Sequence, residues 1–243
     1  MPLPHYVLAP THLTGGTFGW QLNRGRRFLD CHEDFAPELG DNVENAMDWA
    51  DRKIGTRLDW RHTREGGPDR WTATDDRTAA GTDVLRSIEP GTLVVAVGPG
   101  ASGKSTFAAA ARVRTVLSLD TLREQIGGDA GDQSVTPAAV AEQTRLLDWH
   151  LTEGTTVYLD STNVEPHVRA RLIEQADRHG RFITALRFLP DLDTCQARNA
   201  ARPANRQVPA DVLAWQHSLA LTATPEALLA EGFTAAHDIV TPL

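Results

Sequence analysis

The chain has 243 residues, of which 24 are Lys or Arg and 32 are Asp or Glu, so its net charge is −8. This length can bury a substantial core in one or two domains, and the charge argues against a protein that coats nucleic acid, because such binding depends on neutralising phosphates. No apolar stretch reaches the roughly 18 residues of a membrane span, and the N-terminus does not follow the plan of a signal peptide. Only two cysteines occur, far apart, and they suggest no disulfide framework. We therefore expect a cytoplasmic protein with no membrane partner.

The first 90 residues form a segment of their own, which ends at the turn-like stretch 88–91. Apolar residues at helical spacing predict an amphipathic helix over Asn42–Ile54, followed by Gly55. The stretch "TFGWQLNRGRRFL" predicts a β-hairpin that turns at 23–25. Residues 62–83, rich in Thr, Asp, Arg and Gly, are predicted to be loop.

Four of the six tryptophans fall in this segment, with several arginines between them. Aromatic faces among arginines can stack single-stranded bases, but residues 1–90 carry 11 basic against 15 acidic side chains. We therefore expect the tryptophans to pack a core, with base stacking as the alternative. The role of residues 1–90 stays open between packing, formation of a homo-oligomer and orientation of a substrate.

From residue 91 to residue 243 the sequence alternates strands with helices and predicts a second domain. The predicted strands are Thr92–Val97, Thr115–Leu119, Thr155–Leu159, Phe182–Phe188 and His237–Val240. The predicted helices are Lys104–Ala111, Thr121–Ile126, Pro137–Glu153, Pro166–His179, Leu192–Ala200, Pro209–Leu221 and Pro225–Glu231. This alternation indicates an α/β fold with a mostly parallel five-stranded sheet and helices on both faces, and ligands bind at the carboxyl ends of such strands.

A phosphate-binding loop follows the first of these strands. Residues 98–105, "GPGASGKS", match G-x-x-x-x-G-K-[ST] between a strand and a helix. Glycines let the backbone N–H groups converge on phosphate oxygens, Lys104 is expected to bridge the β- and γ-phosphates of ATP, and the Ser105 hydroxyl is expected to ligate Mg²⁺. The predicted nucleotide-binding residues of the loop are Gly98, Gly100, Ala101, Ser102, Gly103, Lys104, Ser105 and Thr106.

Two aspartates follow the next two strands. "VLSLDTLR" places Asp120 at the end of one strand with Arg123 three residues on, and "VYLDSTN" places Asp160 at the end of the other. Each aspartate alone is more typical of a helix cap. Together, on the side of the phosphate loop, one is able to accept a proton from an attacking hydroxyl and the other to hold the magnesium ion or its waters.

Arginines recur every four residues in "CQARNAARPANRQVP", at Arg198, Arg202 and Arg206. Pro203 argues against one unbroken helix here. A solvated basic face is the simple explanation. The position of the stretch also suits a lid whose arginines neutralise charge on a transferred phosphoryl group.

In order along the chain, "GPGASGKST", "LSLDTLREQIGGDAGDQSVT", "YLDSTNVEPHVRARLIEQA", "RNAARP" and "VPADVLAWQ" carry a family resemblance. Residues 92–241 resemble the kinase domain of phage and bacterial polynucleotide 5′-hydroxyl kinases, which are P-loop phosphotransferases of nucleic-acid repair in the group of AAA-type, zeta-toxin-like kinases. The first motif is shared by many NTPases, whereas the D-x-x-R, D-x-T-N and R-N-x-x-R-P series is more selective.

The resemblance implies a role for each matching residue. Asp120 is then the general base that deprotonates the 5′-hydroxyl, and Arg123 positions the 3′-phosphate of the acceptor. Asp160 lies near the metal. Arg202 is the lid arginine on the phosphates of ATP, and Arg198 is the first arginine of the same lid motif.

The resemblance favours an ATP-dependent kinase that phosphorylates the 5′-hydroxyl end of RNA or DNA. One alternative is a kinase of a small hydroxylated molecule such as a nucleoside, sugar or antibiotic, since one scaffold serves many acceptors. A second alternative is a regulatory module in which ATP only switches a conformation.

Overall fold

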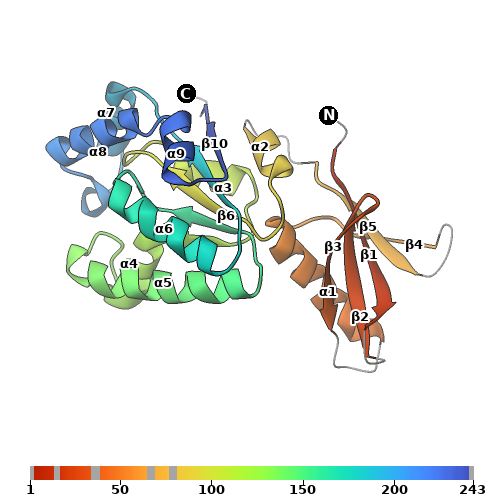
Figure 1. The fold of residues 1–243 in the computed structure, drawn as a ribbon. Coiled ribbons are helices and arrows are strands. Elements are labelled where there is room, and N and C mark those ends of the chain that lie inside the picture. Colours follow the sequence, from red (N-terminus) through yellow and green to blue (C-terminus); the bar gives the residue numbers. More distant parts are fainter. Residues whose placement is uncertain (1–2, 14–16, 34–38, 65–68, 77–80, 241–243) are drawn as a thin grey trace.

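The structure, a computed structural model, describes residues 3–13, 17–33, 39–64, 69–76 and 81–240. Two β-sheets with separate cores lie at opposite ends of the molecule, an N-terminal sheet and a C-terminal sheet (Figure 1). The boundary near residue 90 stays a prediction. The helix just before it, α2 (Thr82–Ser87), contributes Leu85 to the core of the C-terminal sheet.

The N-terminal unit is an antiparallel sheet of five strands with one helix packed on it. The strand order is β3-β2-β1-β5-β4, and the strands are β1 (His5–His12), β2 (Phe18–Arg24), β3 (Arg27–Glu33), β4 (Arg61–Thr63) and β5 (Arg70–Thr74). The hairpin prediction is confirmed, since β2 pairs with β3 and the chain turns at 25–26. The predicted helix is α1 (Leu39–Ile54), and it begins earlier than expected.

The core of this unit is built around the tryptophans, as predicted. Trp20 and Trp49 are buried, and Trp60 and Trp71 pack against the same cluster from partly buried positions. Trp20 meets Trp71 edge to face with a ring-centroid distance of 5.2 Å. An edge-to-face arrangement suits the quadrupoles of the two rings.

The prediction of loop over residues 62–83 is wrong, because most of β4, all of β5 and the start of α2 fall within it. Strand β1 was not predicted at all. Tyr6 and Leu8 of β1 and Ala73 of β5 are buried, Trp71 is partly buried, and the register Leu8↔Trp71 places these side chains over one core. The polar Thr and Arg residues of β5 alternate with the core residues, and this period of two was hidden by the polar composition of the stretch.

The C-terminal sheet has five strands in the order β10-β9-β6-β8-β7, and every pairing between them is parallel. The strands are β6 (Leu93–Val97), β7 (Val116–Ser118), β8 (Val157–Asp160), β9 (Ile183–Arg187) and β10 (Ala235–Asp238). The helices after β6 are α3 (Lys104–Ala110), α4 (Leu119–Gly127), α5 (Thr136–Thr152), α6 (Pro166–Arg178), α7 (Leu192–Ala200), α8 (Ala210–Thr222) and α9 (Pro225–Glu231), with 3₁₀ turns η1 (Gln133–Val135) and η2 (Ala204–Arg206). The predicted fold class is confirmed.

Alternate residues of β6 show why helices cover both faces. Leu93, Val95 and Val97 join the core that includes residues of α5, α6 and α9, whereas Val94 and Ala96 join the core that includes residues of α2 and α3. All five residues are buried, as expected for the central strand of a parallel sheet. The ligand-binding edge is then set by the carboxyl ends of β6, β7 and β8.

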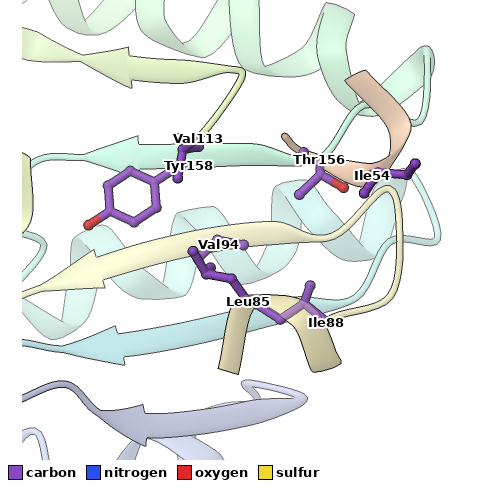
Figure 2. A pocket seen from close by; sticks show the side chains of 8 residues that line it. Ile54, Leu85, Ile88, Val94, Val113, Thr156 and Tyr158 are labelled. Carbon is purple, nitrogen blue, oxygen red and sulfur yellow. The ribbon is translucent and has the colours of Figure 1, made fainter. Parts of the chain in front are cut away.

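The two units meet where α1 ends. A small apolar cavity of about 10 Å³ lies there, too small for more than one water molecule, and its lining includes Ile54, Leu85 of α2, Ile88 and Val113 (Figure 2). Thr56 forms a β-bridge to Val113, and the Thr156 hydroxyl donates to the carbonyl oxygen of Lys53 at 2.5 Å. The end of α1 therefore contacts both the loop between α3 and β7 and the segment that leads into β8.

A buried carboxyl group in α1 gives the N-terminal unit a pH dependence. Asp51 is 5% exposed and accepts hydrogen bonds from Trp60 Nε1 at 2.9 Å and from the Leu58 amide at 3.3 Å. Burial raises its pKa to about 6, although these two hydrogen bonds oppose the shift. The carboxyl therefore contributes stability below pH ~4 that is lost as the pH rises through about 6.

Asp51→Asn should remove this loss, because the amide keeps an acceptor oxygen and carries no charge. Between pH 5 and pH 7.5 the free energy of unfolding of Asp51→Asn should rise by about 1 kcal/mol relative to that of the wild type. Urea unfolding followed by tryptophan fluorescence measures the difference, with the exposed Asp59→Asn as the control. Parallel pH curves for Asp51→Asn and the wild type would contradict the prediction.

Candidate active site

The loop after β6 has the backbone geometry of a phosphate-binding loop. Gly98 donates its N–H to the carbonyl oxygen of Thr162 at 2.9 Å, and a side chain at residue 98 would overlap the carbonyl oxygen of Phe188. Ala101 and Gly103 both have positive φ, 58° and 98°, so the chain curls before α3 begins. The turn therefore presents the N-terminus of α3, with its partial positive charge, at the carboxyl edge of the sheet.

Lys104 opens α3 and is buried under this loop. Its ammonium group donates to the carbonyl oxygens of Gly98 at 3.0 Å and Pro99 at 2.6 Å, and to Ser102 Oγ at 3.1 Å. Burial lowers the pKa of Lys104 to about 8; the charge of Arg202 adds to this and those of nearby aspartates oppose it.

Asp160 ends β8 and lies beside the start of α3. The Ser105 hydroxyl is hydrogen-bonded to its carboxylate, which brings the two predicted metal ligands together. Burial raises the pKa of Asp160, and the Ser105 hydrogen bond and the charges of Lys104 and Arg202 oppose this. The last residue of the sequence motif, Asn163, has φ 48° and donates from Nδ2 to the carbonyl oxygen of Ala96 at 2.8 Å, so it fixes the turn after β8 against β6.

Asp120 lies two residues beyond β7, in the first turn of α4 rather than at the end of a strand. The expected start of this helix, Thr121, is two residues late. Arg123 donates from Nη2 to one carboxylate oxygen of Asp120, and Arg206 donates from Nη2 to the other at 3.1 Å. Arg123 is 9% exposed, and its Nε donates to the carbonyl oxygen of Ala130 at 2.8 Å. Its Nη1 takes no part in these bonds.

The predicted lid is a turn after α7, and Pro203 does interrupt the helix there. Arg202 is half-buried, and its charge acts on Lys104, Asp120 and Asp160, so it belongs to the same site. Burial lowers the pKa of Arg202; the neighbouring guanidinium of Arg206 adds to this, and the aspartates oppose it. Arg198 lies one turn earlier in α7, and its charge acts on the thiol of Cys195.

The lid is held at both ends by residues to which the sequence reading gave no role. Asn199 exchanges two hydrogen bonds with the backbone of Val208, at 2.8 and 3.0 Å. Asn205 Nδ2 donates to Asp129 Oδ1 at 2.8 Å across the site. Asn199 is the asparagine of the R-N-x-x-R-P motif, whereas Asn205 and Asp129 lie outside the matched motifs.

Gln216 of α8 ties this region to the phosphate-binding loop, because its Oε1 accepts the N–H of Gly100 at 2.9 Å. Gln216 is the last residue of the stretch "VPADVLAWQ". Its partner Gly100 lies 116 residues earlier in the chain, and no spacing pattern predicts that contact. Helices α7 and α8 lie at the end of the molecule opposite the N-terminal sheet (Figure 1).

A cavity of about 280 Å³ lies between α3 and α4 at this edge of the sheet. Small apolar side chains of α3 and of the following loop form one wall, and the polar part of the lining comprises Ser105, Ser118, Asp120, Thr121, Glu124, Asp160 and Arg206. The space therefore joins the Asp120 carboxylate to Ser105 and Asp160.

The residues present fit ATP and Mg²⁺. The curled loop, the helix N-terminus and the buried ammonium of Lys104 form a cradle for phosphate oxygens. The hydroxyl of Ser105 and the carboxylate of Asp160 are oxygen donors of the kind that Mg²⁺ prefers. Within the part of the chain that the structure describes, no cluster of three His, Cys, Asp or Glu side chains offers a metal site made by the protein alone.

The parallel sheet and this loop define a P-loop nucleotide-binding protein. The sequence model of a family described as AAA domain matches residues 93–222, more than half of the chain, and the chain belongs to that family. Membership implies ATP binding, usually with Mg²⁺. No curated protein matches the chain in sequence.

Several solved structures are similar at low identity. A chain of a Pnkp1/Rnl/Hen1 complex is 20% identical, with 46% of this chain and 40% of that chain covered and a TM-score of 0.41. A putative kinase from Chloroflexus aurantiacus J-10-fl is 19% identical, with 52% and 75% covered and a TM-score of 0.43. A gluconokinase from Sinorhizobium meliloti 1021 is 19% identical, with 62% and 84% covered and a TM-score of 0.39. The chain thus spans well under half of the first of these, and the likeness concerns the fold alone.

No described helix combines the length and the apolar character needed to cross a membrane.

The depressed pKa of Lys104 predicts how nucleotide affinity changes with pH. Because the ammonium form binds phosphate, the affinity for a non-hydrolysable ATP analogue should fall about tenfold between pH 7 and pH 9 as Lys104 loses its proton near pH 8. Titration calorimetry at the two pH values measures this. Lys104→Met should bind the analogue weakly at both pH values, with no change in affinity between them. An unchanged pH dependence of the affinity in Lys104→Met would assign the titration to another group.

Proposed function

We propose that the protein is an ATP-dependent polynucleotide 5′-hydroxyl kinase, which transfers the γ-phosphate of ATP to the 5′-hydroxyl end of RNA or DNA. The observation that carries the kinase assignment is the cavity of about 280 Å³ that has Asp120 on one side and Ser105 with Asp160 on the other. An acceptor hydroxyl placed there has a general base next to it and the phosphate-binding loop within reach.

Asp120 is the base of this proposal. Its carboxylate accepts the proton of the acceptor hydroxyl while the new oxygen–phosphorus bond forms and the bond from the γ-phosphorus to the leaving oxygen of ADP breaks. Arg123 and Arg206 each hold one oxygen of Asp120, which fixes the carboxylate in place. The orientation of a base contributes to the rate because the reacting atoms must meet in line.

Lys104 and Arg202 supply positive charge on the donor side. Lys104 is already buried within the loop, and Arg202 is close enough to lower its pKa, so both charges act in a partly desolvated space where electrostatic interactions are strong. Arg198 extends the positive charge of the lid. Mg²⁺, held by Ser105 and by Asp160 directly or through water, would offset charge on the β- and γ-phosphate oxygens.

The sequence motifs of the chain support the assignment of a polynucleotide 5′-hydroxyl end as the acceptor. Asp120 and Arg123 of D-x-x-R lie in direct contact, Asp160 and Asn163 of D-x-T-N shape the turn beside the loop, and Arg202 of R-N-x-x-R-P reaches the site. The assignment of Arg123 to the 3′-phosphate of the acceptor stays a prediction, carried by the resemblance.

A kinase of a small hydroxylated molecule is the second candidate. The cavity favours it through its size and through three carboxylates on its lining, Asp120, Glu124 and Asp160, which oppose the approach of a polyanion.

One assay distinguishes the two candidates. Purified protein, labelled ATP and Mg²⁺ are offered a 5′-hydroxyl oligoribonucleotide, the matching oligodeoxyribonucleotide, a 3′-nucleoside monophosphate and a set of sugars. Label on the oligonucleotides or the monophosphate supports the polynucleotide assignment, and label on sugars alone replaces it with the second candidate. ATP hydrolysis unaffected by every acceptor would instead indicate a regulatory ATPase.

Asp120→Asn should lower the rate of phosphoryl transfer roughly 10²- to 10⁴-fold, the range typical of a general base, while leaving ATP binding intact. Steady-state kinetics with the preferred acceptor and calorimetry with an ATP analogue measure the two effects.

The matched control is Glu124→Gln, which removes a carboxylate one turn along α4 from the same cavity and leaves Asp120 in place. Activity retained in Asp120→Asn and lost in Glu124→Gln would move the base to Glu124.

A further inference from the structure

We propose that Arg206 selects acceptors that carry an anionic group, a phosphate or a carboxylate, close to the hydroxyl that is phosphorylated. This inference rests on the proposed function and deepens it, because it names the class of acceptor and assigns its recognition to a residue of the lid.

The charges around the cavity carry the inference. Among the described residues that line it, three are carboxylates and Arg206 is the only cation. A neutral acceptor needs no cation at this wall, and an anionic acceptor would be repelled by the carboxylates alone. The guanidinium of Arg206 is thus the group that makes this cavity compatible with an anion.

The position of Arg206 is fixed by the contacts of η2. Asn205 Nδ2 and the Gly131 amide both donate to Asp129 Oδ1, each at 2.8 Å. A side chain at residue 131 would overlap the carbonyl oxygen of Asn205, so η2 lies directly on the loop that follows α4. The lid therefore presents Arg206 to the cavity, whereas the charge of Arg202 acts on Lys104 as well as on Asp120 and Asp160.

Arg206 also has spare capacity for an acceptor. Its side chain is 47% exposed, and its contact with Asp120 uses Nη2 at 3.1 Å. A planar guanidinium with five N–H donors is able to hold the Asp120 carboxylate with one edge and bind a phosphate or carboxylate with another. Arg123, by contrast, is buried beneath Asp120 and does not line the cavity.

The test compares anionic acceptors with their neutral counterparts, 3′-AMP with adenosine and D-gluconate with D-glucose. For the pair whose anionic member the wild type phosphorylates, the ratio of kcat/KM for the anionic over the neutral member should fall roughly 10- to 100-fold in Arg206→Ala, the scale of one charged hydrogen bond. Arg206→Lys should restore part of the ratio, because it keeps the charge without the planar fork. Arg171→Ala, at an exposed arginine of α6, is the matched control and should keep the ratio of the wild type.

Each outcome decides the matter. No preference for anionic acceptors in the wild type, an unchanged ratio in Arg206→Ala, or a loss confined to Arg123→Ala would overturn the assignment to Arg206. Calorimetric binding of the same four compounds, with an ATP analogue present, separates this inference from the proposed function. Selective binding of an anionic compound that is lost in Arg206→Ala, without any turnover, would refute the kinase and keep the inference. Absence of binding by all four would overturn the inference.

Discussion

The in-register pairing of two short strands positions the chemistry of this protein. Strand β7 pairs with β8 so that Ser118 lies opposite Asp160, and the chain leaves β7 directly into α4. Since β8 also pairs with β6, the start of α4 lies at the same edge of the sheet as the phosphate-binding loop. Carboxyl ends of parallel strands share one edge, so two aspartates 40 positions apart in the sequence line one cavity with Ser105. A slip of one residue would turn every side chain of β7 to the other face of the sheet.

At this edge of the sheet the charged side chains influence one another's pKa values. The burial that lowers the pKa of Lys104 also raises the pKa of Asp160, and their mutual attraction opposes both shifts. The positive charge of Arg202 lowers the pKa of both groups, so it disfavours the protonated form of Lys104 and favours the ionised form of Asp160. A new charge in the site would change both pKa values. The negative phosphates of a nucleotide would raise them, which favours the protonated form of Lys104 and disfavours the ionised form of Asp160. The hydrogen bond from the Gly100 amide to Gln216 links the phosphate-binding loop to α8, which follows the lid directly in the chain.

The N-terminal unit contacts the C-terminal unit beside the acceptor wall and away from the lid. Val113 pairs with Thr56 and also lines the cavity. On either side of Val113, Arg112 forms an ion pair with Asp76, and Arg114 forms one with Asp48 of α1. The packed tryptophans argue against a base-stacking surface built from them.

The sequence by itself determined the parallel sheet, the phosphate-binding loop and the residues of the three motifs, because those signals are local: an apolar run, a glycine turn, a charged residue at a fixed offset. It did not determine the N-terminal sheet, since strands such as β5 acquire their buried face only by pairing with β1, far away in the sequence. Nor did the spacing of the lid arginines give Arg206 a place of its own, and only the resemblance distinguished Arg202 from Arg198. Only the tertiary structure showed that Arg206 lines the cavity beside Asp120, whereas Arg202 is half-buried and its charge acts on Lys104 as well as on the aspartates, because the turn after Pro203 is held by the contact of Asn205 with Asp129. Side-chain contacts across loops depend on distances that no one-dimensional pattern encodes.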